Sequence, residues 1–200
     1  MPIFEYGDTE LNWLKKRDKR MAEAIERIGL IEREIIPDLF AALIRYIIEQ
    51  QISVAAARTV NARLLQLCSG QMTPEALLAI EPTELQRCGT SMRKVEYMRG
   101  VALAVQSGQL NLDAINQMSN EDVVRTLSSL KGIGVWTAEM LMIFSLGRPD
   151  VLSWGDLAIQ RGIMRLYKHK TLPRERFERY RRRYSPYGST ASLYLWALSK

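Results

Sequence analysis

The stretch that decides the fold is Leu130-Lys131-Gly132-Ile133-Gly134-Val135-Trp136-Thr137-Ala138-Glu139-Met140. Its two glycines predict a tight turn, because glycine adopts positive φ, and tolerates close approach of another backbone, at little cost. Ile133, between the glycines, is expected to anchor the turn in the core. The helix that follows begins with unpaired backbone N–H groups and the positive end of its dipole, so a phosphate can bind there without a basic side chain. An isolated Gly-x-Gly also suits a plain turn between antiparallel helices, so the glycines alone leave both interpretations open.

Helical periodicity extends outward from this turn in both directions. Before it, Ser119 resembles the first residue of a capping box and starts a helix, and after it a helix runs from Trp136 to Leu146 and ends at Gly147. No segment shows the sustained alternation of a strand, so the sequence predicts an all-α protein. Further helices are expected at residues 38–50, 54–68, 93–106, 157–167, 174–183 and 189–198, with short helices opening at Pro74 and Pro82.

The composition describes one ordinary domain, or two small lobes, with an excess of basic residues. Of 200 residues 47% are apolar, and 28 Lys and Arg against 22 Asp and Glu give a net charge of +6. Two cysteines and one histidine are too few for a disulfide framework, a four-thiolate cluster or a structural zinc site. No apolar run approaches the roughly 20 residues that cross a bilayer, and the acidic first residues do not resemble a leader, which predicts a cytoplasmic protein. The cations at residues 15–20 and 174–183 suit either a solvated helix face or a phosphate-binding surface.

Continued through Gly147-Arg148-Pro149-Asp150-Val151 and Asp156, the deciding stretch resembles the signature of the helix-hairpin-helix DNA glycosylases. Within that superfamily it is most similar to the alkylated-base branch, 3-methyladenine DNA glycosylase II. The similarity runs from about Asp38 to Leu198 and includes these further matches: Ile48-Glu49-Gln50-Gln51-Ile52-Ser53, Ser91, Lys94, Pro186-Tyr187 and Tyr194-Leu195-Trp196.

The resemblance implies a two-lobed helical fold with the active-site cleft between the lobes. Residues 1–35 would form a helical segment that packs on the second lobe. Residues 36–125 would form the lobe with the glutamine-rich turn, and residues 126–200 would carry the hairpin, the catalytic aspartate and the last helices.

The resemblance also implies that Asp156 is catalytic. Hydrolysis of an N-glycosidic bond requires an anionic partner for an oxocarbenium-like sugar and a water on its face, which one carboxylate can provide. Asp156 follows Trp136 by 156 − 136 = 20 residues, the spacing expected in the family. Asp156 also suits the N-cap of the helix that follows, and the two roles are compatible. The family often has Pro-Asp-Asp or Val-Asp here, so Trp154-Gly155 is a departure that puts the shape of the pocket in doubt.

Aromatic and polar residues complete the predicted site. A flipped base requires an aromatic pocket, and the candidates, each of which also suits a core position, are Trp136, Trp154, Tyr46, Tyr187 and Trp196. Gln51, with Ile52 beside it, is the candidate wedge that fills the hole left in the duplex, although a plain helix-terminal glutamine is the alternative. The other expected DNA contacts are Ser91, Arg93, Lys94, Lys131, Gly132, Ile133, Gly134, Thr137 and Arg161. The resemblance further implies a sodium or potassium ion on the backbone carbonyls of Leu130, Ile133 and Val135, and no other cofactor.

The predicted function is therefore a glycosylase, acting as a monomer on double-stranded DNA that contains a damaged base. It would release alkylated purines such as 3-methyladenine and leave an abasic site. No lyase activity is expected, because Trp136 occupies the position of the lysine nucleophile of bifunctional members. The alternatives are a glycosylase for oxidised or deaminated bases, a noncatalytic helix-hairpin-helix DNA-binding protein, and a basic module that binds nucleic acid through its arginine-rich tail. Iron–sulfur members are excluded because the four clustered cysteines are absent.

Overall fold

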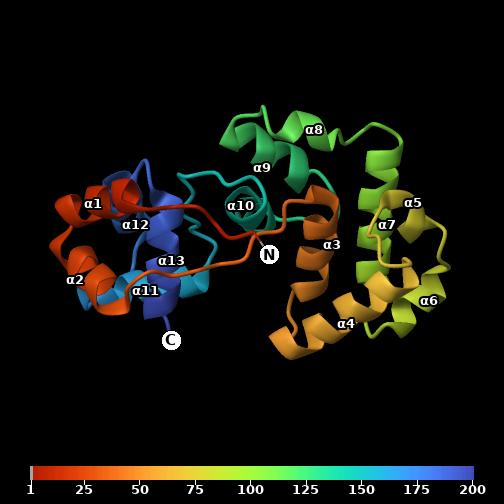
Figure 1. Cartoon of the computed structure of the whole chain (residues 1–200), viewed down its shortest axis with the longest axis horizontal. Coiled ribbons are helices and arrows are strands. Elements are labelled where there is room, and N and C mark those ends of the chain that lie inside the picture. The colour runs from red at the N-terminus through yellow and green to blue at the C-terminus, as the bar shows by residue number, and fades with distance from the viewer. Residues whose placement is uncertain (1) are drawn as a thin grey trace. The chain divides into compact units, whose positions relative to one another are not determined.

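The computed structural model describes residues 2–200, and within that range the chain is built from helices without a strand (Figure 1). The expectation of an all-α fold is confirmed. One isolated bridge joins Ile3 to Glu34. The helices are α1 (Asp8–Arg17), α2 (Lys19–Ile28), α3 (Leu39–Glu49), α4 (Val54–Leu67), α5 (Pro74–Leu78), α6 (Pro82–Arg87), α7 (Met92–Gln106), α8 (Leu112–Ile115), α9 (Asn120–Ser128), α10 (Val135–Phe144), α11 (Leu157–Tyr167), α12 (Arg174–Tyr184) and α13 (Gly188–Leu198). None of these helices is long and apolar enough to cross a membrane.

The chain divides into two compact units. One contains the chain up to Ile35 together with Met142–Lys200, and the other contains Ile36–Leu141. The N-terminal helices thus belong to the same unit as the last helices of the chain. The division falls inside α10, whereas the sequence grouped residues 126–200 together.

The unit with both chain ends has a core formed by α1, α2, α11, α12 and α13. Its fully buried members include Leu14, Met21 and Phe177. Helices α11 and α13 pack at very close range, which the missing side chain of Gly162 in α11 permits. A Cβ on Gly162 would lie 2.2 Å from the carbonyl oxygen of Leu195 in α13. This contact brings the residues that follow Leu195 beside the start of α11.

A buried carboxylate fastens α2 to α11 and α12. Asp18 caps α2 by accepting the N–H of Met21, and its other oxygen accepts hydrogen bonds from the Tyr167 hydroxyl and the Arg183 guanidinium. Burial by itself raises the pKa of Asp18. The hydrogen bonds from Tyr167, Arg183 and Met21 outweigh that effect and hold the pKa below its usual value. Folding of this unit therefore favours the charged form of Asp18.

The second unit is organised around α3 and α7. Helix α3 is apolar on nearly every face, and Leu43, Ile44 and Ile47 are fully buried, as expected of a helix inside a core. Helix α7 packs against α3, α5 and α6. The serine caps predicted from the sequence are present, since Ser53 accepts from the N–H of Ala56 and Ser119 accepts from that of Asp122.

Candidate active site

Asp156 caps the N-terminus of α11 and is nearly buried, with 7% of its surface exposed. Its Oδ1 accepts the backbone N–H groups of Ala158, at 2.8 Å, and Ile159, at 3.0 Å. Its Oδ2 accepts the indole N–H of Trp196 at 3.1 Å. These donors fix the orientation of the carboxylate at the positive end of the helix. The arrangement presents a fixed negative charge in a region largely closed to water, where it can stabilise a cationic sugar.

Trp196 orients this carboxylate, a role that the sequence did not predict. Its ring stacks on Phe144, with centroids 5.5 Å apart and planes inclined by 29°. The stacking holds the indole N–H toward Asp156, because the ring cannot rotate without losing that contact. The sequence placed Trp196 among the pocket aromatics but gave no sign of its hydrogen bond.

Trp154 and Tyr187, the other predicted pocket aromatics in the unit that contains Asp156, pack against the helical core of that unit. The Trp154 ring meets Phe177 edge-on at 5.1 Å, and the guanidinium of Arg174 lies 5.1 Å from the same ring. Tyr187 meets Trp13 edge-on at 6.0 Å. These contacts support the core interpretation that the sequence left open for both rings.

The loop before Asp156 is fixed by its own hydrogen bonds. The carbonyl of Trp154 accepts from the Gln160 side chain at 2.6 Å, which ties the loop to α11. Asp150 accepts from the Ser185 hydroxyl at 2.5 Å and from the N–H of Gly188 at 3.1 Å, which ties the same loop to the start of α13. Asp150 belonged to the quoted motif without an assigned role, and its role in the structure is to hold that connection.

The two glycines of the hairpin have different requirements. Gly132 has φ of +87°, and a Cβ there would lie 2.2–2.8 Å from Tyr97, so only glycine fits. Gly134 is not among the residues with positive φ, and a Cβ there would meet nothing within 4 Å. The expectation of a glycine-specific turn is therefore correct for Gly132 and wrong for Gly134, whose surroundings are open. Ile133 is buried, as expected of an anchor.

The glutamine-rich turn contacts this hairpin directly. The Gln50 side chain donates to the carbonyl of Gly132 at 2.8 Å. Gln51 follows with φ of +56°, a left-handed conformation that is uncommon for residues other than glycine, asparagine and aspartate. Gln51 and Ile52 are both exposed. An exposed side chain in a left-handed conformation, supported by a tethered neighbour, fits the expected wedge.

A hollow of about 300 Å³ lies beside this turn, lined by Gln50, Gln51, Ser91, Arg93, Lys94 and Tyr97. Ser91 caps α7 by accepting the N–H of Lys94 at 3.3 Å. The guanidinium of Arg93 is exposed and lies 5.8 Å from the Tyr97 ring. The ammonium of Lys94 is turned inward, onto the carbonyls of Ile48 and Gln50 at 2.7 Å each.

The remaining predicted residues lie in α3, in the hairpin and first turn of α10, and in α11. Tyr46 is buried, with its hydroxyl 3.5 Å from the Met140 carbonyl. Trp136 is half-buried in the first turn of α10, where Thr137 is buried. Lys131 and Arg161 are exposed, as phosphate contacts must be.

The carbonyls expected to bind a monovalent cation surround the hairpin. That of Leu130 accepts the N–H of Ile133 at 3.2 Å within the turn. Carbonyl oxygens suit sodium or potassium, because each carries two lone pairs. Among residues 2–200, no group of three or more His, Cys, Asp and Glu side chains is arranged to bind a metal.

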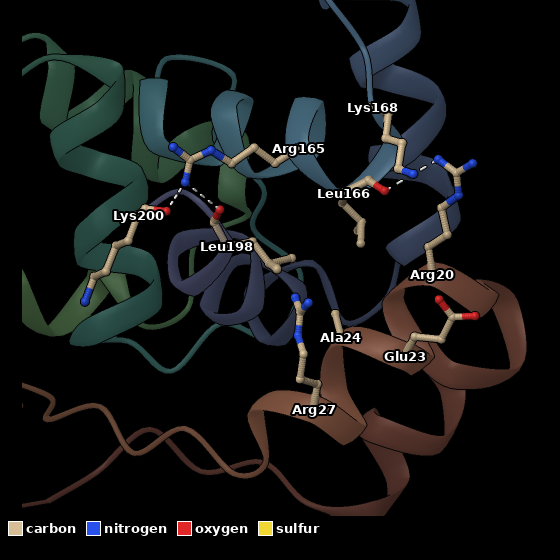
Figure 2. A pocket seen from close by; sticks show the side chains of 9 residues that line it. All are labelled: Arg20, Glu23, Ala24, Arg27, Arg165, Leu166, Lys168, Leu198 and Lys200. Carbon is tan, nitrogen blue, oxygen red and sulfur yellow. Dashed lines mark hydrogen bonds between the residues drawn. The ribbon is translucent and has the colours of Figure 1, made fainter.

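Three of the six arginines of α12 form ion pairs within the fold. In α12, Arg174 and Arg181 pair with Glu178, and Arg183 pairs with Asp18. A basic hollow of about 630 Å³ lies at the end of α11 remote from Asp156 (Figure 2). There Arg165 donates to the carbonyls of Leu198 and Lys200, and Arg20 donates to that of Leu166. These cations bind carbonyls at the C-terminal ends of α11 and α13, a structural role.

Comparison with known proteins identifies the family. The model of the HhH-GPD superfamily base excision DNA repair proteins matches residues 44–186, a range that includes the glutamine-rich turn, the hairpin and Asp156. DNA-3-methyladenine glycosylase 1 of Schizosaccharomyces pombe is 33% identical over 165 residues, which cover 80% of this chain and 72% of the relative.

Solved structures agree with that match. The crystal structure of a DNA-3-methyladenine glycosidase from Bacillus halodurans is 37% identical, with a TM-score of 0.88 over 100% of this chain and 93% of that one. A Schizosaccharomyces pombe 3-methyladenine DNA glycosylase in complex with abasic DNA is 29% identical, with a TM-score of 0.85 over 94% of this chain and 95% of that one. The chain therefore belongs to the HhH-GPD superfamily of base excision DNA repair proteins.

Proposed function

We propose that this protein is a DNA glycosylase that flips alkylated purines such as 3-methyladenine out of duplex DNA, hydrolyses their N-glycosidic bond and leaves an abasic site. The observation that carries the proposal is the carboxylate of Asp156, held at the start of α11 by Ala158, Ile159 and Trp196. The names of the relatives above and the abasic DNA bound to one of them support the same activity.

The chemistry follows from a fixed negative charge. As the base departs, positive charge develops on the sugar, and a carboxylate already oriented toward it stabilises that charge without reorganising. Water on the same face of the sugar then completes the hydrolysis. An alkylated purine carries positive charge and leaves readily, so this mechanism requires no strong general acid.

The DNA is held by the second unit in this proposal. Phosphates approach the N–H groups at the start of α10, where the open space around Gly134 admits them. Lys131 and Arg93, both exposed, supply further charge. Gln51 enters the stack and fills the hole that the flipped nucleotide leaves.

The proposal extends to the products and the partners. The enzyme is monofunctional and acts as a monomer on double-stranded DNA that contains a damaged base. It needs no cofactor other than a sodium or potassium ion at the hairpin carbonyls. Trp136 lacks a nucleophilic amine, so borohydride should trap no covalent adduct on lesion DNA. An efficient adduct that is lost when one particular lysine is replaced would contradict this part of the proposal.

The direct test uses duplexes that each carry one defined lesion, under single-turnover conditions. Release of alkylated purines, with strand breaks appearing only after alkali, is the expected result. Asp156→Asn keeps an acceptor for Ala158 and Ile159 but removes the charge, so base release should slow by about a hundredfold or more. Binding to abasic-analogue DNA should stay within a few fold. A variant that releases bases at the wild-type rate would show that Asp156 is not the catalytic group, and wild-type release of only oxidised or deaminated bases would overturn the substrate class.

A further inference from the structure

The ammonium of Lys94 faces the protein rather than solvent. It donates to the carbonyls of Ile48 and Gln50, at 2.7 Å each, at the C-terminal end of α3. Burial lowers the pKa of this amine. Carbonyls at a helix end lack partners within the helix, and an ammonium satisfies them well. Lys94 therefore acts on the backbone of the glutamine-rich turn.

The carbonyl of Gln50 has a special place in that turn. It belongs to the peptide group that joins Gln50 to Gln51, and peptide groups are planar. A hydrogen bond to this oxygen therefore fixes the plane of the peptide group before Gln51, whose φ is +56°. Lys94 thus sets the direction in which the exposed Gln51 side chain projects.

The same residues reach the hairpin. Gln50 is held at its main chain by Lys94 and at its side chain by the carbonyl of Gly132. Tyr97, which lies one turn after Lys94 on α7, fills the space directly beneath Gly132. The first turns of α7 therefore brace both the hairpin and the glutamine-rich turn.

We propose that Lys94 is a positioning residue. It couples the binding of DNA by the hairpin to the insertion of Gln51 into the base stack. The inference rests on the proposed function of the chain. It assigns Lys94 a role different from the phosphate contact expected from the sequence. Arg93, its exposed neighbour, remains available for that contact.

Three variants on α7 test the assignment. Lys94→Met removes both hydrogen bonds and keeps an unbranched side chain. Arg93→Gln removes an exposed charge from the adjacent position. Arg99→Met is the matched structural control, because Arg99 makes an equivalent pair of hydrogen bonds, to the carbonyls of Leu78 at 3.2 Å and Ile80 at 2.9 Å, away from the glutamine-rich turn.

Two measurements separate insertion from binding. Fluorescence of 2-aminopurine beside an abasic analogue reports unstacking of the duplex. Titration of an undamaged duplex gives the dissociation constant for DNA binding by the hairpin. Lys94→Met should lower the fluorescence at saturating protein and slow base release by about tenfold. The dissociation constant for undamaged DNA should change less than about twofold. Arg93→Gln should weaken every duplex equally and reduce the salt slope by about one, with the saturated fluorescence unchanged. Arg99→Met should lower thermal stability alone.

The outcomes that overturn the inference are specific. Equal weakening of all duplexes by Lys94→Met, with a smaller salt slope, would make Lys94 a phosphate contact. Loss of stability without any change in fluorescence at saturation would make it a structural cap like Arg99. Lys94→Arg, which keeps two donors, should recover most of the fluorescence, and failure to recover would also count against the proposal. The fluorescence test needs no base release, so it stands even if the wild-type protein releases no lesion.

Discussion

The two hairpin glycines lead to a prediction that separates folding from DNA binding. Alanine at Gly132 must adopt a φ near +87° and place its Cβ 2.2 Å from Cδ2, 2.3 Å from Cγ and 2.8 Å from Cβ of Tyr97. The positive φ costs about 1–2 kcal/mol. The clash involves the base of the Tyr97 side chain, not only its far end, so relief requires α7 to move, at a further cost of about 1–3 kcal/mol. Gly132→Ala should therefore lower the free energy of unfolding by about 2–5 kcal/mol.

Gly134→Ala is the matched variant, because its Cβ meets neither protein atoms nor an unfavourable φ. Its free energy of unfolding should stay within about 0.5 kcal/mol of the wild type. Its affinity for every duplex, damaged or not, should fall, since the methyl group occupies the space that a phosphate enters. Urea unfolding and fluorescence anisotropy on the same two preparations measure both quantities. A Gly134→Ala protein that binds DNA normally, or a Gly132→Ala protein as stable as the wild type, would refute the reasoning.

Three further predictions concern Asp156, Gln51 and Asp18. Trp196→Phe keeps an aromatic ring but removes the donor to Asp156, so base release should slow by about tenfold while binding to undamaged DNA is unchanged; an unaltered rate would show that this hydrogen bond is dispensable. Gln51→Gly relieves a left-handed backbone, so stability should be unchanged or up to about 1 kcal/mol higher while base release falls, and full activity would exclude Gln51 as the wedge. The pKa of Asp18 is lowered in the folded protein, so the stability it contributes is present above the unfolded pKa of about 4 and is lost as pH falls through the folded value. Asp18→Asn should remove that part of the acid dependence, and urea midpoints between pH 2 and 7 that keep the wild-type slope would contradict the assignment.

The parts of the fold that the sequence predicted depend on local signals. The caps at Ser53 and Ser119 and the apolar pattern of α3 each involve residues within a few turns of one another, so period and spacing reveal them. The turn at Gly132 was predicted for the same reason. The catalytic candidate Asp156 came instead from the family resemblance, because its position alone indicates only a helix cap.

The connections within the site could not be predicted in this way. Trp196 and Asp156 are 40 positions apart, Lys94 and Gln50 are 44 apart, and the Gln50 bond to Gly132 spans 82. Such pairs are set by the packing of helices against one another, which hydrophobic periodicity and motif spacing do not reveal. The difference between the two glycines was hidden for the same reason, because it depends on where Tyr97 of α7 lies. The sequence thus indicated candidate site residues and left open how they contact one another.

The close passage of α13 over Gly162 makes the site sensitive to a position that bears no side chain. Gly162 lies six residues after Asp156, about 9 Å along the helix axis, and its α-carbon faces the residue that precedes Trp196. Any larger residue there must force α11 and α13 apart, which should weaken the hydrogen bond between the Trp196 indole and the Asp156 carboxylate. A mutational scan scored by base release should therefore rank Gly162 beside the candidate catalytic residue Asp156, although Gly162 has no side chain. For protein engineering, Gly162 is therefore a position that alters the site through helix packing alone.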